Sequence, residues 1–169
     1  EQLHFADLRI VGGRTGTGKT KILRALQKQG HQVLDLEALA HHKGSAFGNI
    51  GETPQPTVEQ FENDLHQAIA QLDRTRPIWT ENESRNIGRV FIPEGLWRAM
   101  KAAPLYNLSI PHALRLHNLV QDYAQTDPAE LIAAFQKIER RLGGQHLKAA
   151  LAALQANDFH AAADIALAY

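Results

Sequence analysis

The sequence predicts an α/β fold of the P-loop NTPase type, in which helices flank a parallel sheet and the C-terminal third is all-helical. Short apolar runs alternate with helical patterns over the first two-thirds of the chain, which is typical of a parallel sheet covered on both faces. A glycine-rich motif separates the first run from the first helix. Only helical patterns follow residue 110, and 169 residues suit one well-buried domain. We therefore expect a P-loop core over 1–110 and a helical extension or lid over 111–169 of the same domain.

The first strand is expected at Leu8–Val11, a short apolar run that ends in two glycines. A helix is expected over Lys19–Gln29, where apolar residues recur at helical spacing and Gly30 suits a C-terminal cap. The second strand is expected at Gln32–Leu36. A loop rich in Gly, Ser and Pro follows, from about residue 39 to residue 56.

Thr57 and Gln60 have the spacing of a capping box and predict the start of the next helix. A third strand is expected at Pro77–Thr80, and Pro93 suits the first turn of another helix. The fourth strand is expected at Leu105–Ile110. These elements alternate as a doubly covered parallel sheet requires.

The rest of the chain is predicted to be helical. Pro111 opens one helix, and Asp127 begins another that is expected to stop near Gly143–Gly144. Two Ala-rich helices then follow, separated by Asn157–Asp158.

Residues Gly13–Thr20 read Gly-Arg-Thr-Gly-Thr-Gly-Lys-Thr and match the P-loop pattern G-x-x-x-x-G-K-[ST]. Chance supplies these four fixed positions in well under about 1% of chains of this length. Glycines let the backbone curl so that successive N–H groups face phosphate oxygens, and the following helix adds its positive end. Lys19 is expected to reach a terminal phosphate, and the Thr20 hydroxyl to bind Mg²⁺. The phosphate-binding residues are expected to be Gly13, Arg14, Thr15, Gly16, Thr17, Gly18, Lys19 and Thr20.

Two alternatives compete with this interpretation. A glycine-rich turn before a purely structural helix has the same composition. A dinucleotide-binding fingerprint is excluded, because its third glycine would fall at Lys21. The loop itself leaves the ligand open, since ATP, GTP and a prenyl diphosphate present the same diphosphate to it.

Two acidic residues end predicted strands at the edge where parallel sheets bind their ligands. Asp35 follows the second strand and Glu81 the third. Glu81 is a candidate for the Mg²⁺ shell, and both residues are candidates for activating water or an acceptor. Each is equally typical of a solvated loop carboxylate.

Composition excludes several classes of site. The chain has no cysteine, so it holds no disulfide, cysteine-ligated zinc or thiolate nucleophile, which fits a reducing cytoplasm. Its 18 basic and 18 acidic residues balance, so any RNA contact must come from a local patch. No apolar run approaches the roughly 18 residues of a membrane span.

Several segments beyond the P-loop resemble the P-loop domain of the tRNA 2-selenouridine synthase family. Agreement continues through Arg140–Gly143 and covers nearly all of the chain. The segments are Gln32–Ala40, His42–Gly48, Gln55–Pro56, Phe61–Glu62, Glu83–Arg85, Ile87–Gly88 and Pro93. Within them, His-Lys-Gly-Ser-x-Phe-Gly is not typical of generic P-loop kinases.

The resemblance implies a transferase that acts on wobble 2-thiouridine of tRNA. Such enzymes attach a geranyl group to the sulfur from geranyl diphosphate, then replace it with selenium from selenophosphate. The family carries a rhodanese-like domain with a reactive cysteine before the P-loop, and nothing in this chain corresponds to it. The chain begins at Glu1 and ends at Tyr169, so we interpret it as the isolated C-terminal domain.

Polar residues in the loops after the strands are candidates for binding the diphosphate or tRNA. Lys43 stands where the family is expected to carry Arg. An arginine could contact a phosphate through two N–H groups, whereas Lys43 offers a single ammonium. Arg85 is a candidate for neutralising the leaving diphosphate. Arg115, in the helix after the fourth strand, is a candidate lid arginine. The tRNA or substrate set is His42, Lys43, Ser45, Arg89 and Arg115. Each is also compatible with ordinary loop solvation or capping.

Two other functions remain compatible with these residues. One is an ATP-dependent small-molecule kinase, in which Asp35 or Glu81 activates an acceptor. The other is a non-catalytic module that holds a nucleotide structurally and docks RNA.

Overall fold

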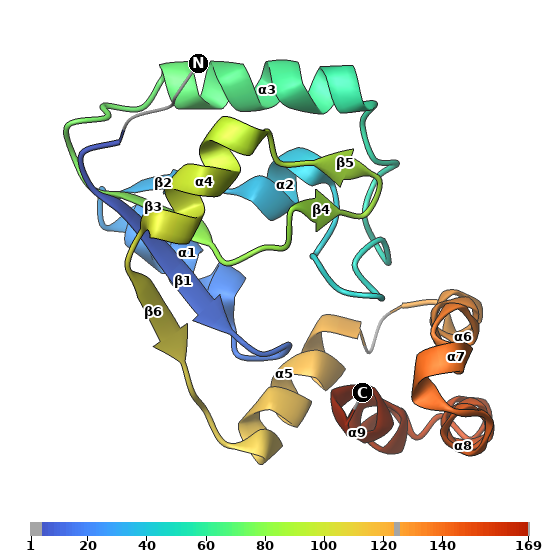
Figure 1. Cartoon of the computed structure of the whole chain (residues 1–169). Helices are drawn as coiled ribbons and strands as arrows, with labels where there is room; N and C mark the ends of the chain where they lie inside the picture. Colours follow the sequence, from blue (N-terminus) through green and yellow to red (C-terminus); the bar gives the residue numbers. More distant parts are fainter. Residues whose placement is uncertain (1–4, 124–125, 169) are drawn as a thin grey trace.

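The computed structural model describes residues 5–123 and 126–168 and contains a four-stranded parallel sheet (Figure 1). The strand order is β2-β3-β1-β6, so the strand that precedes the P-loop lies inside the sheet. The strands are β1 (Leu8–Gly13), β2 (Gln32–Leu34), β3 (Ile78–Glu81) and β6 (Leu105–Leu108). The predicted fold class is confirmed, because every pair in this sheet is parallel and helices flank it.

Helices cover both faces of the sheet. Helix α1 (Lys19–Lys28) contacts β1, β2 and β3, and its Leu23 is buried. Helices α3 (Val58–Ala70) and α4 (Glu94–Ala102) join the strands in the main apolar core, and α4 crosses in front of the strands in Figure 1. Thr57 caps α3 as predicted, since its side chain accepts a hydrogen bond from the Gln60 backbone N–H at 3.1 Å.

Two short features depart from the sequence prediction. Strand β2 ends at Leu34 rather than Leu36, because the Asp35 side chain accepts the Ala38 backbone N–H at 2.9 Å and starts helix α2 (Leu36–Ala40). The hairpin of β4 (Asn86–Ile87) and β5 (Val90–Phe91) was not predicted. Strands of two residues are too short to show a period in sequence.

The C-terminal third is helical as expected and forms a second apolar core. One helix was expected from Asp127 to about Gly143, but the structure breaks it at Ile138. The helices are α5 (His112–Tyr123), α6 (Pro128–Lys137), α7 (Glu139–Leu142), α8 (Gly144–Gln155) and α9 (Phe159–Ala168). Phe47 and Ile50, from the long loop of the first half, pack into this second core.

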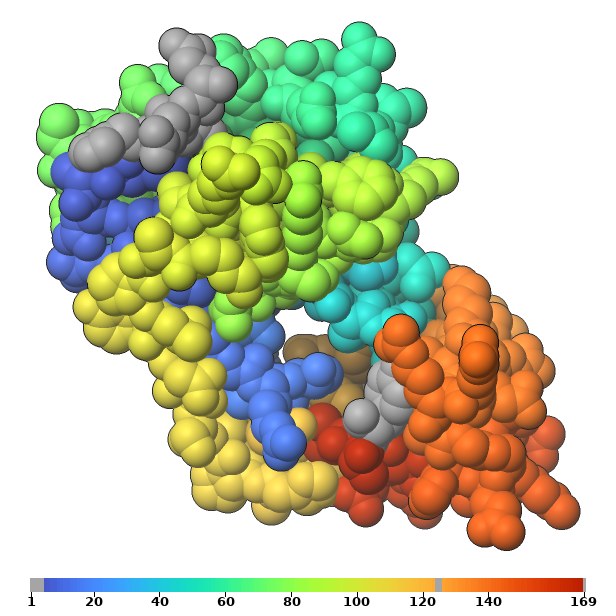
Figure 2. Space-filling view, viewed as in Figure 1, coloured from blue at the N-terminus to red at the C-terminus, as the bar shows by residue number. Residues whose placement is uncertain are grey.

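The two cores form lobes with a hollow between them (Figure 2). The link is made by α5, which follows β6, and by the loop that carries Phe47. The Phe47 ring meets Phe135 edge-on at 4.9 Å between centroids. Among the described residues, no helix combines the length and apolarity needed to cross a membrane.

Candidate phosphate-binding site

The P-loop connects β1 to α1 and is closed by its own hydrogen bonds. Gly16 and Gly18 have φ angles of 81° and 82°, which side chains rarely tolerate. The Thr17 backbone N–H and hydroxyl both donate to the Arg14 carbonyl, at 3.1 and 2.8 Å. The Lys19 ammonium donates to the Gly13 carbonyl at 3.1 Å, across the loop. The loop therefore has the folded shape that a phosphate cradle requires.

Helix α5 holds the outer side of this loop. Arg115 Nε donates to the Thr15 carbonyl at 2.9 Å, and Asn118 Nδ2 donates to the Gly16 carbonyl at 2.8 Å. Only 8% of Arg115 is exposed. Because these carbonyls are engaged on the α5 side, the loop can present N–H groups to a ligand on the other side. The structure thus gives Arg115 a bracing contact; its expected lid role stays a prediction.

Three glutamates gather beside the loop at the carboxyl end of the sheet. The Thr20 hydroxyl donates to Glu37 Oε2 at 3.3 Å, and the Glu37 backbone N–H donates to Glu81 Oε1 at 2.6 Å. Glu83 is hydrogen-bonded to Glu37 and lies against Gly44. Glu37 and Glu83 were not predicted from sequence. Both lie in segments that resemble the family, but the only sign of a role in the site was that each follows a strand closely, which many loop carboxylates do.

Burial raises the pKa of each of these carboxyl groups. Desolvation, and then the charge of Asp35, raises the pKa of Glu81 to about 8, and 2% of its surface is exposed. Desolvation, and then the charge of Glu37, raises the pKa of Glu83 to about 8. Desolvation also raises the pKa of Glu37, against the opposing effect of the Glu83 hydrogen bond and the Lys19 charge. Glu81 and Glu83 therefore retain protons near neutral pH.

The two predicted acidic residues have different surroundings in the structure. Asp35 lies on the wall of the P-loop cavity while its side chain caps α2. Glu81 lies behind that wall, where it holds the backbone of Glu37; its Oε2 has no hydrogen-bond partner among the described residues. The acid that contacts Thr20 is Glu37. The catalytic and metal-binding roles of Asp35 and Glu81 stay predictions.

The predicted binding residues of the loops lie at different places. Lys43 and Ser45 line the P-loop cavity, and the Lys43 ammonium forms an ion pair with Glu52 at 3.2 Å. Arg85 and Arg89 lie outside its walls. His42 lines a neighbouring groove, where its ring accepts the Gly44 backbone N–H at 3.2 Å.

Arg85 forms an ion pair with Glu94 at 3.0 Å, with about half of its side chain exposed. The Arg89 guanidinium donates to the Gln55 carbonyl at 2.8 Å. The expected contacts of these residues with substrate stay predictions. In the described ranges, no group of three His, Cys, Asp or Glu side chains has the arrangement of a protein-only metal site.

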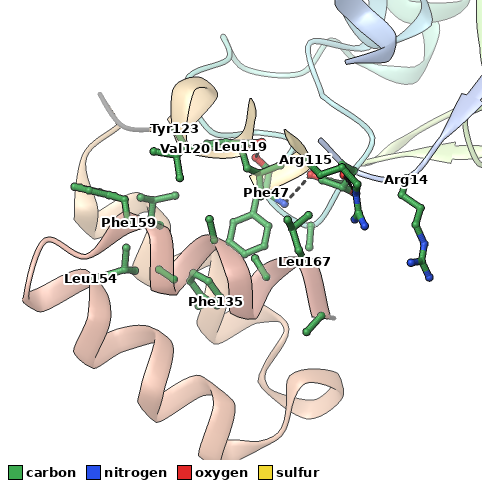
Figure 3. Close-up of a pocket in the computed structure, with 18 residues that line it drawn as sticks. Arg14, Phe47, Arg115, Leu119, Val120, Tyr123, Phe135, Leu154, Phe159 and Leu167 are labelled. Atoms are coloured by element: carbon green, nitrogen blue, oxygen red, sulfur yellow. Dashed lines mark hydrogen bonds between the residues drawn. The ribbon is translucent and has the colours of Figure 1, made fainter. Parts of the chain in front are cut away.

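Two cavities meet beside the P-loop. The P-loop cavity, called the phosphate cavity from here on, has a volume of about 470 Å³, and its walls include Gly16–Lys21, Asp35, Glu37 and Glu83. The second cavity, of about 390 Å³, is apolar and lies between α5 and the last helices (Figure 3). Leu119, Val120, Phe135, Leu154 and Phe159 line it, and Arg14 and Arg115 stand at one end. Four residues belong to both walls: Thr15, Ser45, Leu119 and Tyr123.

A central parallel strand, a P-loop and a helix in direct succession define a protein with a P-loop NTPase-like fold. Comparison with known families is more specific. The family model described as the tRNA 2-selenouridine synthase AAA domain matches residues 6–165. The chain therefore belongs to this family.

Proteins named tRNA 2-selenouridine synthase are among its relatives. Those of Nitrosomonas europaea and Marinobacter nauticus are each 36% identical, over 72% and 85% of this chain. The Bdellovibrio bacteriovorus protein is 42% identical over 69% of this chain. The matched regions span 32%, 43% and 31% of these three relatives, so the chain corresponds to less than half of their length.

The first prediction concerns the brace between α5 and the P-loop. A Cβ at Gly16 would lie 2.6 Å from the Arg115 carbonyl oxygen, whereas a Cβ at Gly30 meets nothing within 4 Å. Both glycines have positive φ, so Gly30→Ala isolates the backbone cost of roughly 1–2 kcal/mol. We expect Gly16→Ala to lower the free energy of unfolding further, as measured by urea denaturation. Equal losses in the two variants would show that α5 does not constrain the loop.

The second prediction concerns the buried carboxyl of Glu81. Its pKa is about 8 in the folded protein and 4.5 ordinarily, so the folded state holds a proton that the unfolded chain loses between these pH values. The free energy of unfolding should therefore fall as pH rises through this window. Glu81→Gln mimics the protonated acid and should flatten the fall, while Glu62→Gln, exposed on α3, should not. Urea denaturation at several pH values measures this, and an unchanged slope in Glu81→Gln would contradict the burial argument.

Proposed function

We propose that this chain is the diphosphate-binding domain of a tRNA-modifying transferase and that it holds geranyl diphosphate for transfer to the sulfur of wobble 2-thiouridine. The observation that carries the proposal is the apolar cavity that adjoins the P-loop. Membership of the tRNA 2-selenouridine synthase AAA domain family supports tRNA as the substrate.

The two cavities suit the two ends of a prenyl diphosphate. The loop N–H groups, the α1 N-terminus and Lys19 offer positive potential for the diphosphate. The adjoining cavity offers aromatic and aliphatic walls to an alkyl chain, and its size lies within the roughly 300–1,000 Å³ of small-molecule sites. Burying the chain there would contribute about 0.8 kcal/mol per CH₂ group. A nucleoside base would find few hydrogen-bonding partners among these walls.

Diphosphate departure requires that negative charge be neutralised as the carbon–oxygen bond breaks. Lys19 is placed to do this from within the phosphate cavity. The Thr20 hydroxyl and the Glu37 carboxylate, 3.3 Å apart, form an oxygen donor pair of the kind that Mg²⁺ accepts alongside phosphates and water. When bound there, Mg²⁺ would offset charge on the leaving diphosphate. Glu81 would serve this pair indirectly, because it fixes the backbone of Glu37.

The complete reaction is proposed to need more than this chain. The chain has no cysteine, so the replacement of the geranyl group by selenium would depend on a rhodanese-like domain and on selenophosphate. With tRNA as its substrate, the whole protein would act in the cytoplasm.

The third prediction separates the two halves of the proposed ligand. Lys19→Ala should lose affinity for both inorganic diphosphate and geranyl diphosphate, because it removes the P-loop lysine from the wall of the phosphate cavity. Ala163→Phe, which fills the apolar cavity, should weaken geranyl diphosphate at least about tenfold and leave inorganic diphosphate unchanged. Isothermal titration calorimetry with each ligand, and with ATP, makes the comparison.

Ala152→Phe is the matched control, because Ala152 is exposed on α8 and lies outside the cavity walls. Unchanged binding of diphosphate to Lys19→Ala would remove the P-loop assignment. Tighter binding of ATP than of geranyl diphosphate, unaffected by Ala163→Phe, would favour a kinase-like ATPase instead.

A further inference from the structure

A third hollow lies on the other side of the loop that follows α2. It is an open groove of about 650 Å³ between this loop, the β4–β5 turn and helix α6. Unlike the apolar cavity, it presents polar side chains, among them His42, Asn49 and Thr53. Arg89 and Lys137 contribute cations from the turn and from α6 respectively.

Ser45 is the one described residue that belongs to the walls of all three hollows. The groove also shares Gly44 and Glu52 with the phosphate cavity, and Ala46 with the apolar cavity. The Ser45 hydroxyl accepts the Phe47 backbone N–H at 3.2 Å, which keeps this junction in place. The groove therefore adjoins the point where the other two cavities meet.

In the proposed reaction, the carbon that is transferred to the tRNA must lie where the phosphate cavity and the apolar cavity meet. With a diphosphate in the P-loop and its alkyl chain in the apolar cavity, the carbon that joins them sits beside the shared residues Thr15, Ser45 and Tyr123. An acceptor has to reach that carbon while both cavities are filled. The groove is an approach that the ligand itself leaves open.

In the described part of the chain, the two cations of the groove are not neutralised by a neighbouring acid, unlike several other cations of this neutral chain. Lys43, Arg85 and Arg98 are each in an ion pair with a glutamate. Within residues 5–123 and 126–168, Arg89 and Lys137 have no ion pair with an acidic side chain. The acid on the groove wall, Glu52, is already paired with Lys43. Unpaired cations on opposite walls suit successive phosphates of an RNA strand.

The wall that carries Arg89 is fixed by Gln55. The Gln55 amide donates to the Ala40 and Ile87 carbonyls at 2.9 and 3.0 Å, and its oxygen accepts the Arg89 backbone N–H at 3.0 Å. Gly88 in the turn has a φ of 61°, and a side chain there would collide with Gln55. The Arg89 side is thus formed before any ligand binds.

We propose that this groove holds the acceptor nucleotide of the tRNA, with Arg89 and Lys137 on flanking phosphates and the thiolated base directed toward Ser45. The inference rests on the proposed function. In the step that follows, the sulfur lone pair forms the carbon–sulfur bond, the carbon–oxygen bond breaks, and the diphosphate leaves with its electron pair. The base loses its N3 proton to water, which leaves it neutral.

The fourth prediction tests the groove through RNA affinity. The double variant Arg89→Glu/Lys137→Glu should weaken binding of an anticodon stem-loop RNA carrying wobble 2-thiouridine at least about tenfold, and lower the salt dependence of log K by about 1–2, as the loss of one or two phosphate contacts requires. Fluorescence anisotropy across a salt series measures both. Arg76→Glu/Arg98→Glu is the matched control, because it makes the same charge change at exposed sites outside the groove.

Calorimetry with geranyl diphosphate keeps this inference separate from the proposed function. Unchanged diphosphate affinity in Arg89→Glu/Lys137→Glu, together with weakened RNA binding, supports the groove as the acceptor site. An equal loss of RNA affinity in the control pair, or no loss of RNA affinity in either double variant, overturns the assignment of the groove as the acceptor site. If the unsubstituted chain binds the RNA through this pair but does not bind geranyl diphosphate, the proposed prenyl ligand fails and the RNA site stands.

Discussion

The hydrogen bonds from α5 to the P-loop are the contacts on which the candidate site depends. Arg115 and Asn118 engage the carbonyls of Thr15 and Gly16, and this fixes the outer side of the loop. The same helix supplies Leu119 and Tyr123 to the walls shared by the phosphate and apolar cavities. One helix thus contacts the P-loop, packs against α9 of the C-terminal lobe and lines both cavities.

The buried glutamates impose the second constraint. Glu81 Oε1 accepts a hydrogen bond from the backbone N–H of Glu37, and this contact holds the first turn of α2 against the P-loop. Glu81 and Glu83 can be buried close to other acids because they remain protonated, as their raised pKa values indicate. A cation that arrived with a diphosphate would favour their ionised forms and displace those protons. Ligand binding and the protonation of the cluster are therefore expected to be linked.

The sequence was sufficient for features set by local patterns. The P-loop motif predicted the curled loop between β1 and α1 because backbone geometry demands its glycines, and Thr57 predicted the start of α3 because a capping hydrogen bond spans three residues. Features set by distant contacts were not visible. Arg115 reaches a carbonyl 100 residues away, so its bracing contact has no local signature. Glu37 gains its place only when Glu81 binds its backbone, and Asp35 was read as a strand end although it caps a helix.

The central claim is that the P-loop and the adjoining apolar cavity bind the two ends of one prenyl diphosphate. The most direct measurement is a crystal structure of the chain with a geranyl thiolodiphosphate, in which sulfur replaces the bridging oxygen and slows departure of the diphosphate. We expect the diphosphate to bind the backbone N–H groups of Gly16–Thr20 and the alkyl chain to lie between Phe135 and Leu154. An alkyl chain in solvent, or a diphosphate bound away from the loop, would contradict it.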